Sequence, residues 1–142
     1  MTSSETIVLA GRALIPGEAS GSLLVSHEPL SFWGGYDSDT GEIIDRRHSL
    51  SGENAAGRIL AIPGTRGSST TTAVLLEAIR QGNAPAALLT AGTDSFLTLT
   101  AIVADEMYGE APPVIALTEA DFDKLVDGRQ ARVTPDGTVF ME

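Results

Sequence analysis

The spacing of apolar and polar residues changes about one third of the way along the chain. In the first third, short apolar runs alternate with glycine-rich breaks, which is typical of short strands joined by turns. The pattern predicts strands over residues 7–15 and 21–26, a strand end or irregular loop over 31–37, and a tight turn over 37–41 that leads into 42–45. We expect the strand pairing in this part to be antiparallel.

From residue 58 onward, short aliphatic runs alternate with longer helical patterns. Strands are predicted over 58–63, 86–90 and 114–117, and helices over 71–81 and 95–107. In the first helix one face carries Val74, Leu75, Ala78 and Ile79, and Gly82-Asn83 predicts its end. The second helix is apolar nearly all round, which predicts that it is buried.

The last part of the chain predicts short elements. Thr118, with Asp121 three residues later, is a variant of the capping-box pattern and predicts a short helix. Residues 132–133 and 138–141 flank the turn 135–137 and predict a hairpin. Alternating strands and helices favour a parallel sheet with crossovers of one hand. We therefore predict an α/β fold of three layers, β/β/α, in which a parallel central sheet carries a smaller antiparallel layer, as a single domain over residues 1–142.

The amino-acid composition excludes several kinds of site. The chain has no cysteine, so it forms no disulfide, zinc–thiolate site or cysteine-held iron–sulfur cluster of its own. The two histidines, His27 and His48, are too few for a histidine metal site. We expect this chain to bind no metal and no cofactor.

The charge balance limits the partners. Nineteen acidic residues against nine basic ones give a formal net charge of −10, which disfavours nucleic acid and anionic membrane surfaces. No apolar run has the length of a membrane span, and the first five residues lack the pattern of a secretory signal. We expect a cytoplasmic protein.

One loop gathers residues that suit chemistry on an anion. The segment 64–70, Gly-Thr-Arg-Gly-Ser-Ser-Thr, lies between a predicted strand and the start of a predicted helix, where free backbone N–H groups attract carboxylates and phosphates. Arg66 adds a planar fork for a carboxylate, Gly67 allows close approach, and Ser68, Ser69 and Thr70 add hydroxyls. The simpler interpretation is a helix N-cap within a polar turn, and local chemistry alone leaves the two equal. The segment matches neither a Walker A loop nor a nucleophile elbow.

A second polar cluster lies over residues 45–52. Arg47 and His48 suit contact with an anion or with a partner protein, whereas a solvated loop is the simpler interpretation. Trp33 is either a core residue or a docking anchor, and we expect it to contact the core with an exposed edge.

Several segments then stand in a recognisable order and spacing. They are residues 29–37 (PLSFWGGYD), 40–45 (TGEIID), 48–53 (HSLSGE), 57–60 (GRIL) and 67–70 (GSST). Together they resemble the small swivel subunit of the aconitase X family over roughly residues 8–118. The resemblance implies the swivelling β/β/α fold and a large aconitase-like partner subunit that holds an iron–sulfur cluster.

The resemblance also implies an activity, that of a dehydratase (hydro-lyase) small subunit inactive without its large subunit. Members of the family are cis-3-hydroxy-L-proline dehydratases in bacteria or phosphomevalonate dehydratases in archaea. In such a reaction a base removes the proton beside a carboxylate while the cluster iron, as a Lewis acid, draws off the hydroxyl. The family's serine base corresponds to Ser68, with Ser69 as the alternative, and Arg66, Gly67, Ser69 and Thr70 would bind the hydroxy-acid substrate.

We favour cis-3-hydroxy-L-proline as the substrate, because no lysine stands in the loop to meet a phosphate; phosphomevalonate is the alternative. Two hypotheses come from other classes. A phosphohistidine-type carrier would need a Thr-His-Gly-Gly-like loop, which His48-Ser49-Leu50 does not match. A non-catalytic scaffold domain would bind its partner without using Ser68.

Overall fold

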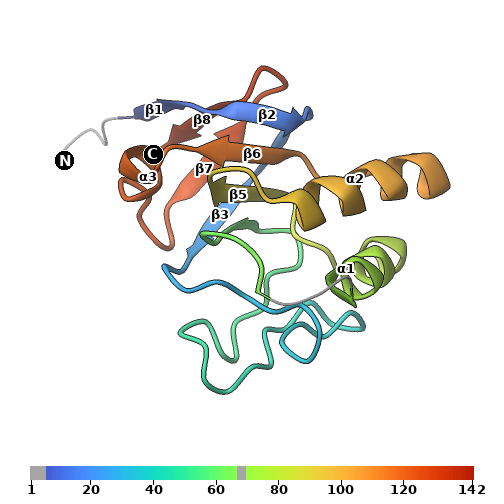
Figure 1. Cartoon of the computed structure of the whole chain (residues 1–142). Helices are drawn as coiled ribbons and strands as arrows, with labels where there is room; N and C mark the ends of the chain where they lie inside the picture. The colour runs from blue at the N-terminus through green and yellow to red at the C-terminus, as the bar shows by residue number, and fades with distance from the viewer. Residues whose placement is uncertain (1–5, 67–69) are drawn as a thin grey trace.

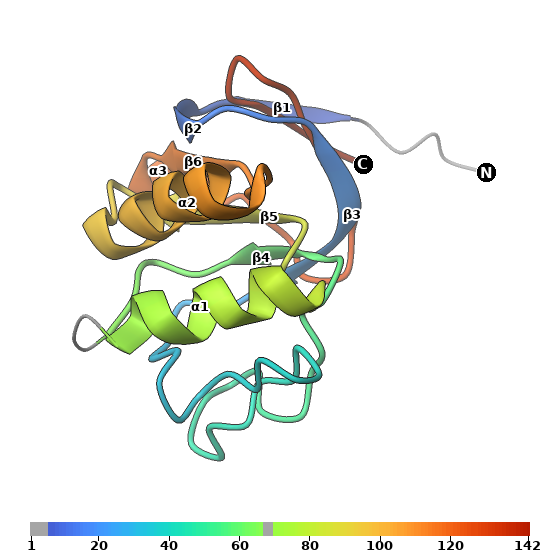
Figure 2. The ribbon, with the colours of Figure 1, turned by 90° about the vertical axis from the view of Figure 1, so that its right-hand side faces the viewer.

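The computed structural model describes residues 6–66 and 70–142 of the chain. Its strands are β1 (Ile7–Ala10), β2 (Arg12–Ile15), β3 (Ala19–Val25), β4 (Ile59–Ala61), β5 (Ala87–Ala91), β6 (Val114–Leu117), β7 (Gln130–Val133) and β8 (Thr138–Met141). Its helices are α1 (Thr70–Gln81), α2 (Ser95–Tyr108) and the short α3 (Glu119–Phe122). Figures 1 and 2 show α1 and α2 side by side on one side of the sheet, with the antiparallel strands on the other.

The strands form one mixed sheet in the order β1-β8-β7-β3-β4-β5-β6-β2. One part, made of β1, β8, β7 and the start of β3, is antiparallel. In the other part the end of β3 runs parallel to β4, β5 and β6, and β2 closes the edge antiparallel to β6. Because β3 belongs to both parts and bends between them, the sheet folds over itself (Figure 2). The predicted three-layer β/β/α class is confirmed.

Strict alternation along the parallel strands builds two hydrophobic cores. Leu60 and Leu88 face the helices and pack with Leu75, Ala78 and Ala101. Ile59, Leu89 and Ile115, on the same parallel strands, point to the opposite side of the sheet, where they pack with Val133 and Val139 of the antiparallel strands β7 and β8. Successive side chains of a strand point to opposite faces of the sheet. A strand that is buried on both faces therefore needs apolar residues at every position, and not only at every second one.

The predicted first strand, 7–15, is two strands separated by Gly11. β1 pairs with β8, and β2 pairs with β6. The backbone N–H of Gly11 donates to the Gly137 carbonyl at 3.0 Å, and a Cβ on Gly11 would lie 2.4 Å from Ile115 Cγ2. The single-strand prediction was wrong because the chain changes partners at a position where only glycine fits.

The prediction that residues 95–107 form a buried helix was right for the helix and wrong for its burial. One face of α2 is buried through Leu97, Thr100, Ala101 and Ala104. The outer side leaves large apolar side chains in solvent, namely Phe96, Leu99, Ile102 and Met107. The prediction assumed that every apolar helix face is buried, whereas residues 6–66 and 70–142 leave this face of α2 uncovered.

The long segment 26–58 is irregular, and its pairing among described residues consists of isolated bridges such as Tyr36 with Ile43. Phe32 and Tyr36 fill the core below α1, whereas Trp33 is 67% exposed, so the expected core contact of Trp33 was wrong. The Tyr36 hydroxyl donates to the Asn83 carbonyl at 2.7 Å, and burial raises the pKa of Tyr36 above its usual range. This bond ties the segment to the end of α1.

Most other sequence predictions are confirmed within two residues. α1 ends at Gln81, and Gly82, which follows it, has a φ of 78°, the left-handed angle expected of a glycine that terminates a helix. The Thr118 side chain accepts from the Asp121 N–H and caps α3. β7 and β8 form the closing hairpin.

Gly11→Ala should lower the free energy of unfolding by about 1–3 kcal/mol, because the added methyl overlaps Ile115 and the Gly137 carbonyl. Gly17→Ala is the matched control, since a Cβ there would lie no closer than 3.2 Å, to Pro113 Cβ, and would meet no backbone carbonyl among its nearest atoms. Urea denaturation of both variants measures the difference. Equal stability of the two variants would contradict the account of the strand break.

Candidate functional site

The carboxyl ends of four parallel strands meet at one edge of the sheet. The segments that leave this edge are 26–30 after β3, 62–66 after β4, 92–94 after β5 and Thr118 after β6. In open α/β sheets, ligands bind outside the carboxyl ends of the strands. Residues 62–66 leave the sheet at this edge and lead into residues 67–70, the predicted serine loop, and α1 and α2 begin at the same edge.

The backbone just before the serine loop is pinned by a neighbouring segment. The Leu30 N–H donates to the Gly64 carbonyl at 3.2 Å, and the Arg66 N–H donates to the Leu30 carbonyl at 3.0 Å. These bonds pair Leu30 with Thr65 in a short parallel bridge. Leu30 is fully buried, so the bridge is anchored in the core.

Asp94 fixes the same backbone from the other side. Its Oδ2 accepts from the Thr65 N–H at 2.7 Å and from the Thr65 hydroxyl at 2.8 Å. Its Oδ1 accepts from the Leu97 N–H at 3.0 Å and thereby caps α2. One carboxylate thus joins the N-terminus of α2 to the residues that lead into the serine loop. Gly64 leaves room for it, since a Cβ there would lie 3.1 Å from Asp94 Oδ2.

A second network holds the segment that carries Leu30. The Ser26 and Ser49 hydroxyls lie 2.7 Å apart, and the Ser49 N–H donates to Glu28 Oε1 at 3.0 Å. The His48 ring is buried between the two segments: Nδ1 accepts from the Leu50 N–H at 3.1 Å, so Nε2–H donates to the Glu28 carbonyl at 3.2 Å. This pattern assigns His48 the neutral Nε2–H form and uses both ring nitrogens on backbone groups.

The predicted site residues divide into those the structure places and those it does not describe. The Arg66 side chain is exposed and forms no ion pair with the described residues. Gly67, Ser68 and Ser69 lie outside the described residues, and Thr70 is the first residue of α1. Arg47 is exposed and His48 is buried, so the two do not present their side chains together.

Asp94 was missed from the sequence, although a signal was present. Aspartate directly before a helical apolar pattern is a standard N-cap residue. The bond from Asp94 to Thr65 crosses 29 positions of the chain and depends on β4 and β5 being neighbours in the sheet. The roles of Ser26 and Glu28 likewise depend on contacts distant in sequence.

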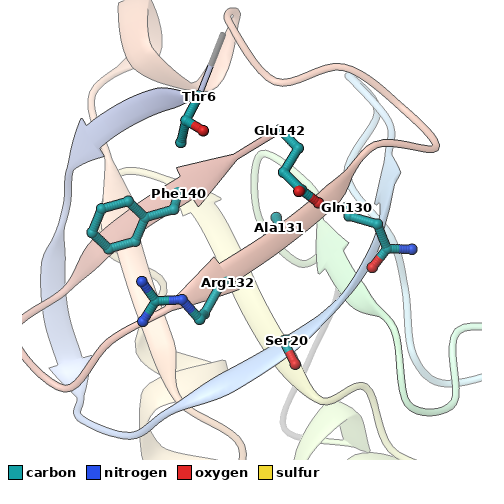
Figure 3. Close-up of a pocket in the computed structure, with 7 residues that line it drawn as sticks. All are labelled: Thr6, Ser20, Gln130, Ala131, Arg132, Phe140 and Glu142. Atoms are coloured by element: carbon teal, nitrogen blue, oxygen red, sulfur yellow. The ribbon is translucent and has the colours of Figure 1, made fainter. Parts of the chain in front are cut away.

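Two hollows bear on where a ligand can lie. One, of about 290 Å³, opens at the carboxyl edge and is lined by His27, Pro63, Ala91, Glu119, Phe122 and Asp123. The other, of about 360 Å³, lies on the outer face of the antiparallel strands and is lined by Thr6, Ser20, Gln130, Ala131, Arg132, Phe140 and Glu142 (Figure 3). In the second, the Arg132 guanidinium stacks on the Phe140 ring at 4.5 Å, on the far side of the sheet from α1 and α2.

The residues of this chain do not suit an iron–sulfur cluster. The sequence has no cysteine, and across residues 6–66 and 70–142 no three His, Asp or Glu side chains gather into a metal-binding group. Within the same residues, no helix combines the length and apolar character needed to cross a membrane.

Comparison with known proteins is consistent across sequence and structure. A family model described as the aconitase X swivel domain matches residues 8–141. A cis-3-hydroxy-L-proline dehydratase of Pseudomonas aeruginosa is 49% identical over 126 residues, which cover 89% of this chain and 22% of that protein. A phosphomevalonate dehydratase small subunit of Thermococcus onnurineus is 35% identical, with 94% of this chain and 98% of that one covered.

A solved structure gives the same fold. The crystal structure of Thermococcus kodakaraensis aconitase X in its holo-form superposes with a TM-score of 0.85 at 30% identity, over 96% of this chain and 98% of the matched chain. The chain therefore spans about a fifth of the length of the hydroxyproline dehydratase and nearly all of the archaeal small subunit.

Asp94→Asn should release the backbone before the serine loop while keeping the cap of α2. The amide oxygen can still accept from Leu97, but the NH₂ group cannot accept from Thr65. We expect amide exchange at Thr65 to speed up by about tenfold, while exchange at Leu97 changes much less.

The matched control is Asp105→Asn, an exposed carboxylate on the same helix, which should leave both amides unchanged. Hydrogen exchange followed by NMR measures each amide separately. Unaltered exchange at Thr65 in Asp94→Asn would show that the carboxylate does not hold this backbone.

Proposed function

The chain belongs to the aconitase X swivel-domain family, and we propose that it acts as the small, swivel subunit of an aconitase-like dehydratase. As one domain over residues 1–142, it brings the loop 64–70 to an active site that the large aconitase-like subunit completes. The observation that carries this proposal is the pinned backbone of Gly64–Arg66, held by Leu30 on one side and Asp94 on the other. A catalytic loop must be placed precisely, and this requires that the backbone leading into it is held rigidly on both sides.

The proposed reaction removes water from a β-hydroxy acid. Ser68 accepts the proton from the carbon beside the substrate carboxylate, with Ser69 as the alternative base. Arg66, exposed next to the loop, binds the carboxylate with its planar fork, and the backbone and hydroxyls of Gly67, Ser69 and Thr70 complete the contact. The hydroxyl leaves as water, with activation from groups outside this chain.

Magnitudes explain why the large subunit is needed. Ionising a serine hydroxyl near neutral pH requires roughly 8 kcal/mol of extra stabilisation. The start of a helix supplies about 1 kcal/mol, or about 2 kcal/mol at a partly buried site. The rest must come from charges and from exclusion of water in the closed complex. The isolated chain should therefore be inactive.

Cis-3-hydroxy-L-proline is the substrate we propose. The bacterial dehydratase of that name is 49% identical, whereas the archaeal phosphomevalonate dehydratase small subunits are 32–35% identical. The loop 64–70 also has no lysine to meet a phosphate. Phosphomevalonate is the second candidate, favoured by the match over 98% of the Thermococcus onnurineus small subunit.

The second polar cluster has a supporting role in this proposal. His48 is buried with both ring nitrogens bonded to backbone groups, which suits holding the Leu30 segment rather than carrying a phosphoryl group. Arg47 is exposed and remains a candidate for contact with the large subunit.

Ser68→Ala in the reconstituted two-subunit enzyme should lower kcat by roughly a hundredfold to ten-thousandfold while assembly stays normal, because only the base is lost. Steady-state dehydration of cis-3-hydroxy-L-proline and of phosphomevalonate measures both the effect and the substrate. Ser20→Ala, at an exposed serine on the outer face of the antiparallel strands, is the control and should leave kcat unchanged. Full activity of a Ser68→Ala/Ser69→Ala variant would overturn the proposal and leave a scaffold role.

A further inference from the structure

The outer side of α2 carries an apolar stripe that the described part of the chain leaves in solvent. Phe96, Leu99 and Met107 are exposed, and the half-buried Val103 lies between Leu99 and Met107. These four residues recur at intervals of three and four, so they form one continuous line, here named the α2 flank. Leu99 is 52% exposed, and Met107 is 62% exposed. The neighbouring Ile102 widens the stripe.

This stripe differs from ordinary scattered apolar exposure. Among the described residues, four of the eight exposed large hydrophobic side chains belong to this helix, namely Phe96, Leu99, Ile102 and Met107. No charged residue interrupts the helix from Ser95 to Ala104. Single exposed apolar residues are common, but a contiguous stripe marks an interaction surface.

The position of the α2 flank relates it to the serine loop. α2 begins at Asp94, whose carboxylate binds Thr65 just before the loop. The first exposed residue of the flank, Phe96, is two positions beyond Asp94. α1, which follows the loop, runs beside α2 (Figure 2). A large partner protein that contacts the serine loop would therefore also lie next to the α2 flank.

We propose that the α2 flank is the docking surface for the large aconitase-like subunit. The proposal rests on the proposed function, since it assigns the contact that brings the serine loop to its partner. The hydroxyproline dehydratase relative supports this occupant, because the matched part is 22% of that protein and the remainder is a much larger body joined to the same domain. A second copy of this chain has no comparable support.

The acidic residues near the α2 flank predict the kind of surface that the large subunit should carry. The C-terminal end of α2 and the turn after it carry exposed carboxylates at Asp105, Glu106 and Glu110, and the whole chain has a net charge of −10. An apolar patch bordered by lysine or arginine on the large subunit would match this arrangement. The apolar centre supplies affinity, and the charged rim supplies orientation and rate of association.

The first test compares polar substitutions on and off the flank. Leu99→Gln/Met107→Gln keeps helix-forming side chains and should weaken the affinity for the large subunit by about tenfold or more. Val8→Thr, at a residue 56% exposed on β1, is the matched control and should leave the affinity unchanged. Biolayer interferometry against the purified large subunit gives the Kd, and circular dichroism confirms that each variant is folded.

A second measurement needs no variant. Hydroxyl-radical footprinting of the wild-type chain should show Met107 oxidised readily when alone and several-fold more slowly in the complex. Met141, which is fully buried, is the internal reference and should be protected in both states. Equal oxidation of Met107 in both states would overturn the docking proposal even if the double variant failed to fold.

The outcomes separate this inference from the proposed function. Loss of affinity in the flank variant, with a Ser68→Ala chain that assembles but is inactive, supports both. Unchanged affinity in the flank variant, with Ser68→Ala inactive, overturns the docking surface alone. If sedimentation shows that the isolated chain is a dimer that the flank variant dissociates, while affinity for the large subunit is unchanged, the flank is a self-association surface and the proposal is wrong.

Discussion

The carboxylate of Asp94 is the interaction on which the arrangement of this edge depends. It accepts two hydrogen bonds from Thr65 and one from the Leu97 N–H, so the start of α2 and the backbone before the serine loop share one anchor. Hydrogen bonds to an ionised acceptor are about twice as strong as those between neutral groups. The bond is available only because β4 and β5 are parallel neighbours, so that the segments after them leave the sheet side by side.

This anchor links the two proposals made for the molecule. If the large subunit docks on α2, the same contact fixes the position of Asp94 and, through it, of Thr65 and Arg66. The Leu30 bridge prevents the backbone from moving away on the other side. When the small subunit binds as a rigid body, its loop would then take the same position relative to the large subunit each time. Catalytic groups lose much of their effect when they are displaced by about 1 Å, so such coupling matters for rate.

Local patterns in the sequence predicted most of the elements and the class of fold. The aliphatic strands 58–63 and 114–117, the helix-stopping Gly82 and the Thr118 cap depend on neighbours within a few residues, and each is confirmed. The break at Gly11 depends on Ile115 and Gly137, and the hydrogen bond of Asp94 depends on Thr65, both far away in the chain. Exposure of the α2 flank and of Trp33 was mispredicted because apolar surface was assigned to the core of this chain. For the site, the roles of the loop 64–70 and of Arg66 stay predictions, whereas the Leu30 bridge and the His48 contacts that hold it join residues distant in sequence and became visible only in three dimensions.

A crystal structure of the assembled complex with a substrate analogue tests the central claim most directly, because it shows the loop and α2 in one measurement. The account predicts that Arg66 and the start of α1 face the cleft of the large subunit, that Asp94 keeps its bonds to Thr65, and that the α2 flank is buried in the interface. A large subunit seated on the outer face of the antiparallel strands, with the serine loop and α2 left in solvent, would contradict it.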